Sequence, residues 1–274
     1  MNIKRMSALV LTLMTVLAIQ AARVDTLTIH SSLLPKPMKV TMVTPDAAAD
    51  KTRKFPTVYL LNGYGGDYRS WLTIQPRLKE LSDLYGMILV APDGMDSWYF
   101  DAPANSKMKM ESFFTKELVP FIDANFQTID NPAQRAITGL SMGGHGALWL
   151  AMRHPDIWKN CGSTSGGVNI VPFGQKWKIP QALGAKPSAK TLAAHSVSTV
   201  AKTIKPGQNN IIFDCGSDDF FFKVNSDLHN QLLNQKVPHD YISRPGGHSL
   251  KYWANSILYQ LLFFNENFQK AAAK

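Results

Sequence analysis

The stretch that decides the fold runs from Arg135 to Met152 and reads RAITGLSMGGHGALWLAM. A short apolar strand sequence (AIT) comes first, a G-x-S-x-G pattern centred on Ser141 follows, and a helix-forming run (GALWLAM) completes it. This order of strand, tight turn and helix is what a nucleophile elbow requires. Because the turn is strained, the flanking positions need residues without bulk, and Gly139 and Gly143 supply them. The stretch therefore predicts that Ser141 is an activated nucleophile.

Strand-like and helix-like segments alternate along the rest of the chain. We expect strands at 24–30, 38–44, 56–61, 87–90, 135–138, 160–165, 210–214 and 240–243, and helices at 71–84, 111–125, 143–154, 224–235 and 249–264. This alternation predicts a single α/β domain over residues 23–274, with a mostly parallel central sheet covered by helices on both faces. The segment from Val168 to Gly207 carries four prolines among short apolar pieces. We interpret it as a small cap excursion over the active-site end of the sheet.

The first 22 residues differ in composition from the rest of the chain. Lys4 and Arg5 form a basic start, an uncharged run of 14 residues follows from position 6 to 19, and the small residues Ala21 and Ala22 come next. This layout is typical of a secretory signal peptide, removed between Gln20 and Arg23. The apolar run is shorter than the roughly 20 residues that a membrane helix needs. We therefore expect an exported protein, periplasmic or secreted, without a membrane span in its mature part.

The formal charge of +9 is concentrated in one part of the chain. Between residues 157 and 213 there is no Asp or Glu, whereas seven lysines fall there. A solvated basic face explains this pattern, and so does a surface that favours an anionic polymer such as a uronic-acid-bearing polysaccharide. Because the lysines are scattered and the chain carries an export signal, nucleic acid is not expected as a partner.

The two cysteines, Cys161 and Cys215, lie in apolar segments that we interpret as neighbouring core strands. The first falls near the start of its strand and the second near the end. Parallel neighbours would hold them beyond the Cα spacing of about 7 Å that a disulfide allows, so we expect two buried free thiols. The His, Asp and Cys residues show no metal-ligand spacing, and neither a metal nor another cofactor is expected.

A serine hydroxyl becomes a good nucleophile when an imidazole takes its proton and a carboxylate orients that imidazole. In this type of site the chain order is Ser, then acid, then His. His248 follows a Pro-Gly-Gly turn at a strand end and is the candidate base, whereas His145, one turn into the elbow helix, is expected to be a packing residue. The acid is expected just past the strand at 211–213. There Asp218 and Asp219 are adjacent, and residue chemistry alone leaves the choice between them open.

Four stretches together, YLLNGYGG, GLSMGGHGAL, CGSDDF and PGGHSLKYW, resemble the esterase-D-like branch of the α/β hydrolases. That branch includes the feruloyl and acetylxylan esterases of carbohydrate esterase family 1, the tributyrin esterases and S-formylglutathione hydrolase. The resemblance extends over residues 24–268 and implies an α/β-hydrolase fold with serine ester hydrolysis. It further implies Ser141 as nucleophile, Asp219 rather than Asp218 as acid, and His248 as base.

The same resemblance places an oxyanion-binding loop at residues 62–66, where the family has the pattern H-G-x-x-G. The backbone N–H groups of Tyr64 and Met142 are the implied donors. Asn62 stands where the family usually has His. Since an amide side chain offers different hydrogen bonds from an imidazole, the sequence leaves open how this loop is held.

The export signal argues against the cytosolic thioester substrate of S-formylglutathione hydrolase. We expect a hydrolase of acyl or aryl esters, of the feruloyl or acetyl xylan type. Aromatic side chains of the WYFDAP stretch can stack on a sugar or phenolic ring, although they are also compatible with core packing. The expected substrate pocket contains Tyr64, Trp98, Tyr99, Asp101 and Trp177. An acyltransferase with the same triad, or a catalytically silent carbohydrate-binding protein on this fold, are the alternatives.

Overall fold

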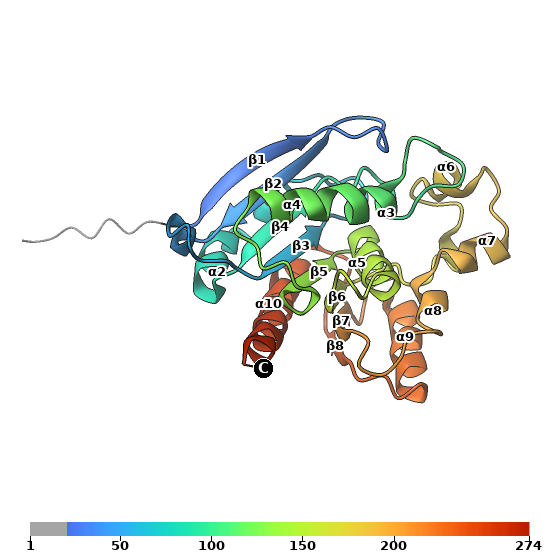
Figure 1. Ribbon diagram of the computed structural model, residues 1–274. Helices are drawn as coiled ribbons and strands as arrows, with labels where there is room; N and C mark the ends of the chain where they lie inside the picture. Colours follow the sequence, from blue (N-terminus) through green and yellow to red (C-terminus); the bar gives the residue numbers. More distant parts are fainter. Residues whose placement is uncertain (1–20, 274) are drawn as a thin grey trace, which may run out of the picture.

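The computed structural model describes residues 21–273, so the predicted signal peptide lies almost entirely outside the described residues. Within this described range, eight strands form one sheet in the order β1-β2-β4-β3-β5-β6-β7-β8 (Figure 1). The first two pairs, β1–β2 and β2–β4, are antiparallel, and every other pair is parallel. The strands are β1 (Arg23–Ile29), β2 (Met38–Thr44), β3 (Thr57–Leu61), β4 (Ile88–Pro92), β5 (Arg135–Gly139), β6 (Asn160–Thr164), β7 (Asn210–Gly216) and β8 (Asp240–Arg244).

All eight predicted strands are present, and their ends shift by two residues at most. Every residue of β3, β4, β5 and β6 is buried. A central parallel strand is covered on both faces, which selects the continuous apolar runs that made β3 and β4 visible in the sequence. β6 is buried although most of its residues, NCGST, are polar. The mostly parallel α/β architecture that the sequence predicts is confirmed.

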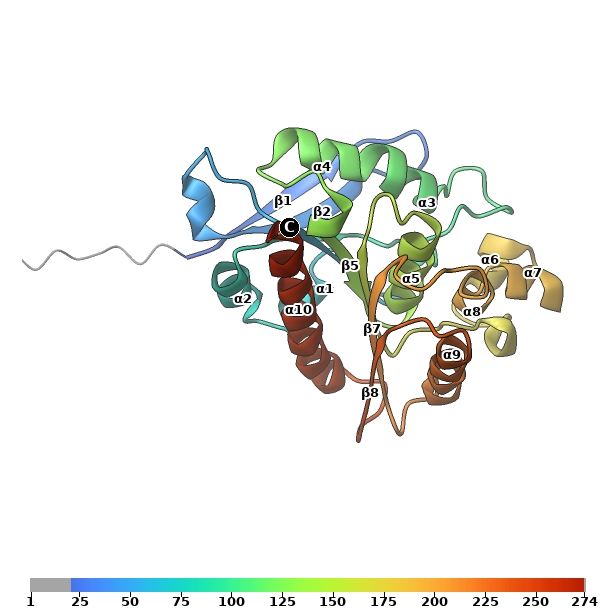
Figure 2. The same cartoon turned by 60° about the horizontal axis from the view of Figure 1, so that its bottom comes forward.

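Helices cover both faces of the sheet, as the edge-on view in Figure 2 shows. On one face, α10 (Leu250–Ala272) packs beside α1 (Ser70–Ile74) and α2 (Leu78–Tyr85) over one apolar cluster. The other face carries α5 and α9 together with the helical segment that precedes β5; their bounds are α3 (Met110–Phe113), α4 (Val119–Asn125), α5 (Met142–Arg153) and α9 (Phe222–Asn234). The core therefore has two halves, divided by the sheet.

Two predicted helices have different bounds in the structure. The helix expected at 71–84 is broken into α1 and α2, because Pro76 has no backbone N–H and forces Gln75 out of the helical region; Gln75 has φ −125° and ψ 88°. The helix expected at 249–264 continues to Ala272. Its extension is explained by Phe268, which lies four residues after Phe264 on the same helix face and is buried beside it.

The helical segment expected at 111–125 contains a π-helical turn, Phe114–Leu118, between α3 and α4. Pro120 lies just after this turn. Proline removes one donor from the regular ladder of hydrogen bonds, and a single wide turn is a common response of a helix to such an interruption. The segment nevertheless continues along the sheet as one rod.

Glu111 fastens this rod to α5, the helix that follows Ser141. Its carboxylate accepts hydrogen bonds from Trp149 Nε1 (2.9 Å), Arg153 Nε (2.8 Å) and His154 Nε2 (2.7 Å). Burial by itself raises the pKa of the carboxyl group, but these three hydrogen bonds and the charge of Arg153 outweigh it and lower the pKa to about 2. The charged form of Glu111 is therefore strongly favoured in the folded protein.

Replacing Glu111 by Gln is expected to lower the free energy of unfolding at neutral pH by about 2–3 kcal/mol, since one pKa unit corresponds to about 1.4 kcal/mol. The folded-state pKa lies below the unfolded value, so this stability is fully present above the unfolded pKa of 4.5 and is lost as the pH falls through about 2. Urea titrations between neutral and acidic pH measure it. The gap between wild type and variant should close on acidification, whereas Glu80→Gln, at an exposed ion pair with Arg77, should show almost no gap.

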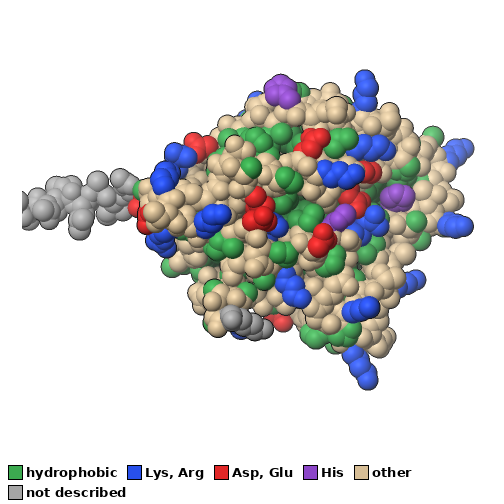
Figure 3. Space-filling model, viewed as in Figure 1, with side chains coloured by type: hydrophobic (Ala, Val, Ile, Leu, Met, Phe, Trp, Pro, Cys, Tyr) green, Lys and Arg blue, Asp and Glu red, His purple; other side chains and the backbone are tan. Residues whose placement is uncertain are grey.

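The segment from Val168 to Gly207 forms the predicted cap excursion at one end of the sheet (Figure 1). It contains only short elements: a 3₁₀ turn at Val171–Phe173 and helices α6 (Ile179–Leu183), α7 (Ala189–Ala194) and α8 (Val197–Val200). Figure 3 shows Lys and Arg side chains standing out along the side of the molecule where the excursion lies. Six of the seven lysines between residues 157 and 213 are exposed, so the basic bias of this part of the chain is a surface feature.

Cys161 and Cys215 are both free and buried, as the sequence predicts. Residue 161 pairs in register with Ile211, four residues before Cys215 on the neighbouring strand. Burial raises the pKa of both thiols. Among residues 21–273, none of the helices combines the length and the apolar character needed to cross a membrane.

Candidate active site

Ser141 occupies the sharp turn between β5 and α5, with φ 55° and ψ −116°. A positive φ is strained for a side chain with a Cβ and persists only where the surroundings fix it. Here the flanking glycines allow the close contacts that fix it. A Cβ on Gly139 would meet the backbone of Gly143 at 2.5 Å, and one on Gly143 would meet the Leu61 carbonyl oxygen at 2.4 Å. The strand, turn and helix predicted around Ser141 therefore form a nucleophile elbow.

His248 lies in the loop between β8 and α10 and reaches Ser141. Its Nε2 is 3.0 Å from Ser141 Oγ, a distance at which the serine hydroxyl donates to an unprotonated nitrogen. The imidazole is held between aromatic side chains: Phe220 lies 4.3 Å from it between ring centroids, and Trp253 meets it edge to face at 4.8 Å. These contacts place the ring although it comes from a loop.

The structure brings Asp219, and not Asp218, to the imidazole. Asp219 Oδ2 accepts a 2.8 Å hydrogen bond from His248 Nδ1, and its Oδ1 accepts one of 2.8 Å from the backbone N–H of Phe221. The Asp219 side chain is fully buried, whereas Asp218 is exposed. With Nδ1 carrying the proton, Nε2 is free to accept from Ser141, so the three side chains form one directed chain of hydrogen bonds.

Asp214, which the sequence places inside the strand, forms its hydrogen bonds with residues other than His248. It is buried and accepts hydrogen bonds from Thr164 Oγ1 at 2.8 Å and Gln260 Nε2 at 2.8 Å, with Ser256 Oγ as a third donor. Arg244 lies within ion-pairing distance at 3.5 Å. This carboxylate therefore joins β6, β7, β8 and α10, and it has no contact with His248.

Two backbone N–H groups beside Ser141 are free to bind a ligand. Among residues 21–273, neither the Tyr64 nor the Met142 amide donates to a protein acceptor. Met142 is the first residue of α5, where helical N–H groups lack partners and the helix dipole favours negative charge. Gly63, next to Tyr64, lies against the elbow so closely that a Cβ there would meet Leu140 Cδ1 at 2.5 Å. Tyr64 and Ser141 thus line the same pocket, and Met142 directly follows Ser141.

Asn62 holds the loop at residues 62–66 by hydrogen bonds, in the position where the family usually has His. The side chain is buried, and its Oδ1 accepts a 2.8 Å hydrogen bond from the Gly94 N–H. Its Nδ2 donates to the Gly63 carbonyl at 2.9 Å. The Tyr99 hydroxyl lies 3.0 Å from the Asn62 carbonyl and 3.1 Å from its Oδ1. The loop is therefore anchored to the segment after β4 by an amide and a buried phenol.

Removing this anchor should slow the reaction more than it weakens binding. We expect Asn62→Ala to lower kcat on p-nitrophenyl acetate roughly ten- to a hundred-fold with KM nearly unchanged, because small misplacements of catalytic groups have effects of this size. Tyr99→Phe removes one hydrogen bond and should cost less. Steady-state kinetics and thermal melts test this against Asn125→Ala, at an exposed asparagine that bonds within its own helix. An unchanged kcat in Asn62→Ala would contradict the anchor role.

A pocket of about 480 Å³ opens beside Ser141 and His248. Tyr64, Trp98 and Trp177 line it, as the sequence predicts. Trp98 Nε1 donates to the Trp177 carbonyl at 3.0 Å, which joins the loop after β4 to the cap excursion. The pocket also contains apolar side chains that sequence reasoning did not assign to it: Ile74, Leu140, Phe220, Leu250 and Trp253.

Tyr99 and Asp101 do not line the pocket, and this corrects the prediction that they do. The Tyr99 ring is fully buried, and its hydroxyl contacts the carbonyl and Oδ1 of Asn62. Trp98 and Tyr99 both have a positive φ, of 57° and 63°. The Asp101 carboxylate is occupied by Ser112, whose N–H and hydroxyl donate to it at 2.9 and 2.6 Å. Both side chains are thus engaged in contacts outside the pocket.

His145 is a buried packing residue, in agreement with the prediction. Its ring nitrogens lie 3.1 Å from the Trp98 carbonyl oxygen and 2.9 Å from the His195 carbonyl oxygen. Burial lowers its pKa to about 4, an effect larger than the opposing one of the two carbonyls. The ring therefore connects α5, one turn after Ser141, to the pocket wall and to the excursion.

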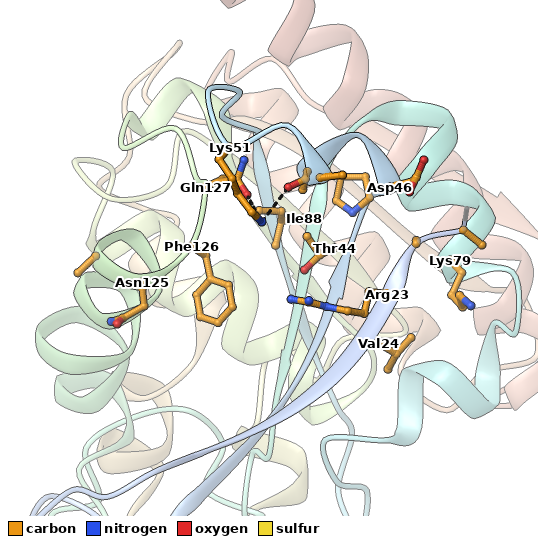
Figure 4. Close-up of a pocket in the computed structure, with 16 residues that line it drawn as sticks. Arg23, Val24, Thr44, Asp46, Lys51, Lys79, Ile88, Asn125, Phe126 and Gln127 are labelled. Atoms are coloured by element: carbon orange, nitrogen blue, oxygen red, sulfur yellow. Dashed lines mark hydrogen bonds between the residues drawn. The ribbon is translucent and has the colours of Figure 1, made fainter. Parts of the chain in front are cut away.

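A second and larger hollow lies away from Ser141. It has a volume of about 960 Å³ and is lined by Arg23, Lys51, Ile88 and Phe126, among others (Figure 4). Lys51 donates there to Gln127 Oε1 and to the Ala48 carbonyl. Ile88 is the first residue of β4, whereas Ser141 follows the carboxyl end of β5. This hollow therefore lies at the amino ends of the parallel strands, and Ser141 lies at their carboxyl ends. Among residues 21–273, no group of three or more His, Cys, Asp and Glu is placed to hold a metal.

The α/β fold and a serine at a nucleophile elbow with a contacting histidine define a serine hydrolase of the α/β-hydrolase class. The family described as "Putative esterase" matches residues 31–264. This chain belongs to that family, in its esterase-D-like branch, and is a serine carboxylic-ester hydrolase.

Known proteins agree with this placement. An acetyl esterase of Caldicellulosiruptor saccharolyticus is 27% identical over 253 residues, which cover 82% of this chain and 91% of the relative. S-formylglutathione hydrolase of Rattus norvegicus is 29% identical over 237 residues, covering 76% of this chain and 81% of the relative. Among solved structures, a ferulic acid esterase aligns with a TM-score of 0.77 at 26% identity, over 90% of this chain and 99% of its own.

Proposed function

We propose that the protein is an exported serine esterase that uses Ser141 as nucleophile, His248 as base and Asp219 as orienting acid. One observation carries the proposal: a chain of hydrogen bonds runs from Ser141 Oγ through His248 to Asp219, with contacts of 3.0 and 2.8 Å, at the edge of an open apolar pocket. This arrangement supplies the proton acceptor that a serine hydroxyl needs and fixes the imidazole tautomer.

The reaction follows from these contacts. His248 Nε2 takes the hydroxyl proton as Ser141 Oγ bonds to the ester carbonyl carbon, and the carbonyl oxygen becomes an oxyanion. When the carbon–oxygen bond to the alcohol breaks, His248 returns the proton to the leaving alkoxide and an acyl-enzyme remains. Water then attacks the acyl carbon, His248 takes its proton, and Ser141 recovers that proton as the acid leaves. Asp219 stabilises the imidazolium in both halves.

The N–H groups of Tyr64 and Met142 are the proposed oxyanion donors. Both are unpaired within the described part of the chain, and an amide that is already in place costs no reorganisation when charge develops. The loss of one such donor typically costs roughly 2.7–4 kcal/mol of barrier. Because the side chain is not involved in donating, a substitution of Met142 would not test this role, whereas displacement of the Tyr64 loop would.

The pocket supports an ester with an apolar or aromatic part as substrate. Four aromatic rings line the pocket, those of Trp98, Trp177, Phe220 and Trp253. The rings of Trp177 and Phe220 are stacked with their centroids 5.6 Å apart. A volume of about 480 Å³ is sufficient for a phenolic acyl group or a sugar ring. Similarity to an acetyl esterase and to a ferulic acid esterase supports esters of plant polysaccharide, of the feruloyl or acetyl xylan type, as the natural substrates.

A substrate panel tests this specificity. The purified protein would be assayed on acetyl, butyryl and feruloyl esters, free and attached to a xylan chain. We expect kcat/KM to be higher for the aromatic acyl ester than for butyrate, and Trp177→Ala to reduce that preference. A preference for long aliphatic chains would contradict the proposal. Product partition between water and an added sugar alcohol separates hydrolysis from acyl transfer.

Export rests on the composition of residues 1–22, most of which lie outside the described range. The structure adds one constraint. Ala22 is fully buried, and its N–H donates to Asp83 Oδ2 at 2.8 Å. Ala22 is therefore packed as part of the folded domain. We therefore expect processing to leave Ala22 in the mature chain. Intact mass of the protein recovered after expression with its leader tests this, and an unprocessed chain retained in the cytoplasm would contradict export.

A further inference from the structure

Asp96 lies in the loop after β4, and its carboxylate reaches the loop that holds Tyr64. Met95 and Asp96 both have a positive φ, of 50° and 54°, and such backbone conformations persist where the surroundings over-determine them. In this conformation Asp96 Oδ1 accepts a 2.7 Å hydrogen bond from the Gly65 N–H. The bond fixes the peptide that immediately follows Tyr64 and so restrains the amide proposed for the oxyanion.

The other oxygen of the same carboxylate holds the cap excursion. Lys178 Nζ donates to Asp96 Oδ2 at 2.9 Å, and Lys178 follows Trp177, whose ring forms the pocket wall. Trp177 and Lys178 both have a positive φ, of 47° and 59°. The turn that presents the Trp177 ring is therefore held by the ion pair on one side and, on the other, by the hydrogen bond from Trp98 to the Trp177 carbonyl.

Lys178 also offsets the charge that Asp96 brings near the site. A carboxylate close to a developing oxyanion would oppose it, because like charges repel. The Lys178 ammonium neutralises the carboxylate and lies 5.9 Å from the centroid of the Tyr64 ring. The pKa of Lys178 is raised by its hydrogen bond to Asp96 and by the charge of that carboxylate. The nearby carboxylates of Asp93 and Asp67 have cations of their own, Lys36 and Arg69.

We propose that Asp96 is a positioning residue that couples the pocket wall to the oxyanion loop. Through its hydrogen bond with Gly65, the Asp96 carboxylate fixes the position of the Tyr64 amide. Through its ion pair with Lys178, it fixes the position of Trp177. The inference rests on the proposed function, because it takes the Tyr64 N–H to be an oxyanion donor. It predicts that the two oxygens of Asp96 affect two properties that can be measured separately. The contact of Oδ1 with Gly65 affects the rate of bond cleavage, and the contact of Oδ2 with Lys178 affects the recognition of a bulky aromatic ester.

Three variants separate these quantities. Asp96→Ala frees the Gly65 N–H and should lower kcat on p-nitrophenyl acetate about ten- to a hundred-fold, the range expected for a misplaced catalytic group. Asp96→Asn keeps an acceptor for Gly65 but loses the ion pair. On p-nitrophenyl acetate its kcat should stay within about three-fold of wild type. Its KM for methyl ferulate should rise about two- to five-fold, a loss of the size that a surface ion pair gives. Lys178→Met leaves the carboxylate uncompensated and should lower kcat more than Asp96→Asn does.

Affinity for a transition-state analogue distinguishes positioning from a loss of folding. A trifluoromethyl ketone forms a tetrahedral adduct with the active serine, and its affinity for Asp96→Ala should fall by the same factor as kcat/KM, while the melting temperature stays near that of wild type. Asp227→Ala, which breaks the exposed Lys223–Asp227 pair on α9, is the matched control and should behave as wild type. Asp96→Ala with wild-type kcat and analogue affinity would overturn the inference. If Ser141→Ala remained active instead, the proposed function itself would fail.

Discussion

Replacing Ser141 by alanine is expected to lower kcat on p-nitrophenyl acetate by about a million-fold, the loss that removal of a triad serine causes in a serine hydrolase. The variant keeps the pocket and the oxyanion donors but has no atom to form the acyl-enzyme. A small residual rate over water should remain, because oxyanion binding alone still accelerates hydrolysis. Initial rates on the purified variant measure the effect, with a thermal melt to verify that it is folded.

The fold should tolerate this change, because the Ser141 side chain hydrogen-bonds only to His248 among the described residues. Relief from the positive φ is not expected, since alanine also has a Cβ. Ser226→Ala, at a serine of α9 remote from the pocket, is the control and should retain full activity. A fluorophosphonate probe should label wild type and Ser226→Ala but not Ser141→Ala. More than a few per cent of wild-type activity in Ser141→Ala would rule out the assignment.

The second large effect is expected at Asp219. Replacement by Asn should lower kcat about ten-thousand-fold, because an amide in place of the carboxylate favours the wrong imidazole tautomer and no longer stabilises the imidazolium. The position of Asp219 allows the Asn variant to be compared directly with wild type. Asp219 is fully buried, and its second oxygen accepts from the Phe221 N–H, so the variant's carbonyl oxygen can keep that bond while its NH₂ group faces His248.

Asp218→Asn is the matched control for this prediction. The two residues are adjacent and chemically identical, but Asp218 is exposed and hydrogen-bonds only weakly, with Ser217 Oγ at 3.4 Å. We expect Asp218→Asn to keep kcat within about two-fold of wild type, as most surface substitutions do. The reverse result, a mild effect at position 219 and a severe one at 218, would show that the acid had been assigned to the wrong residue.

The sequence determined by itself those features that depend on local patterns. Buried parallel strands such as β3 and β4 are continuous apolar runs and were visible in that way. The outer strands β1 and β8 are not fully buried and are not such runs, and they were placed by the alternation of strand-like and helix-like segments. The elbow was visible because its strained turn needs small residues at fixed offsets from Ser141. His248 could be selected for its place after a strand and a Pro-Gly-Gly turn. Helix bounds were less certain where one residue overrides the pattern, as Pro76 does between α1 and α2.

Residue chemistry alone could not tell which of two neighbouring side chains points into the site; the family resemblance implied Asp219, and the tertiary structure shows why it is Asp219 that reaches His248. Asp218 and Asp219, or Trp98 and Tyr99, have the same local propensities, and the direction of each side chain depends on loop dihedrals and on partners far along the chain. Phe220 and Trp253 stand within motifs that carried the family resemblance, yet their place in the pocket follows from packing on His248.

The support of the oxyanion loop shows the same division. Asn62 was recognisable as a departure from the family pattern, but its anchors, Gly94 and Tyr99, lie more than thirty residues away. Asp96 meets Gly65 and Lys178 across sequence separations of 31 and 82 residues. Contacts at such separations are made by the packing of loops at the carboxyl end of the sheet. Local sequence patterns carry no signal for them, because they report only which residues form a strand, a turn or a helix.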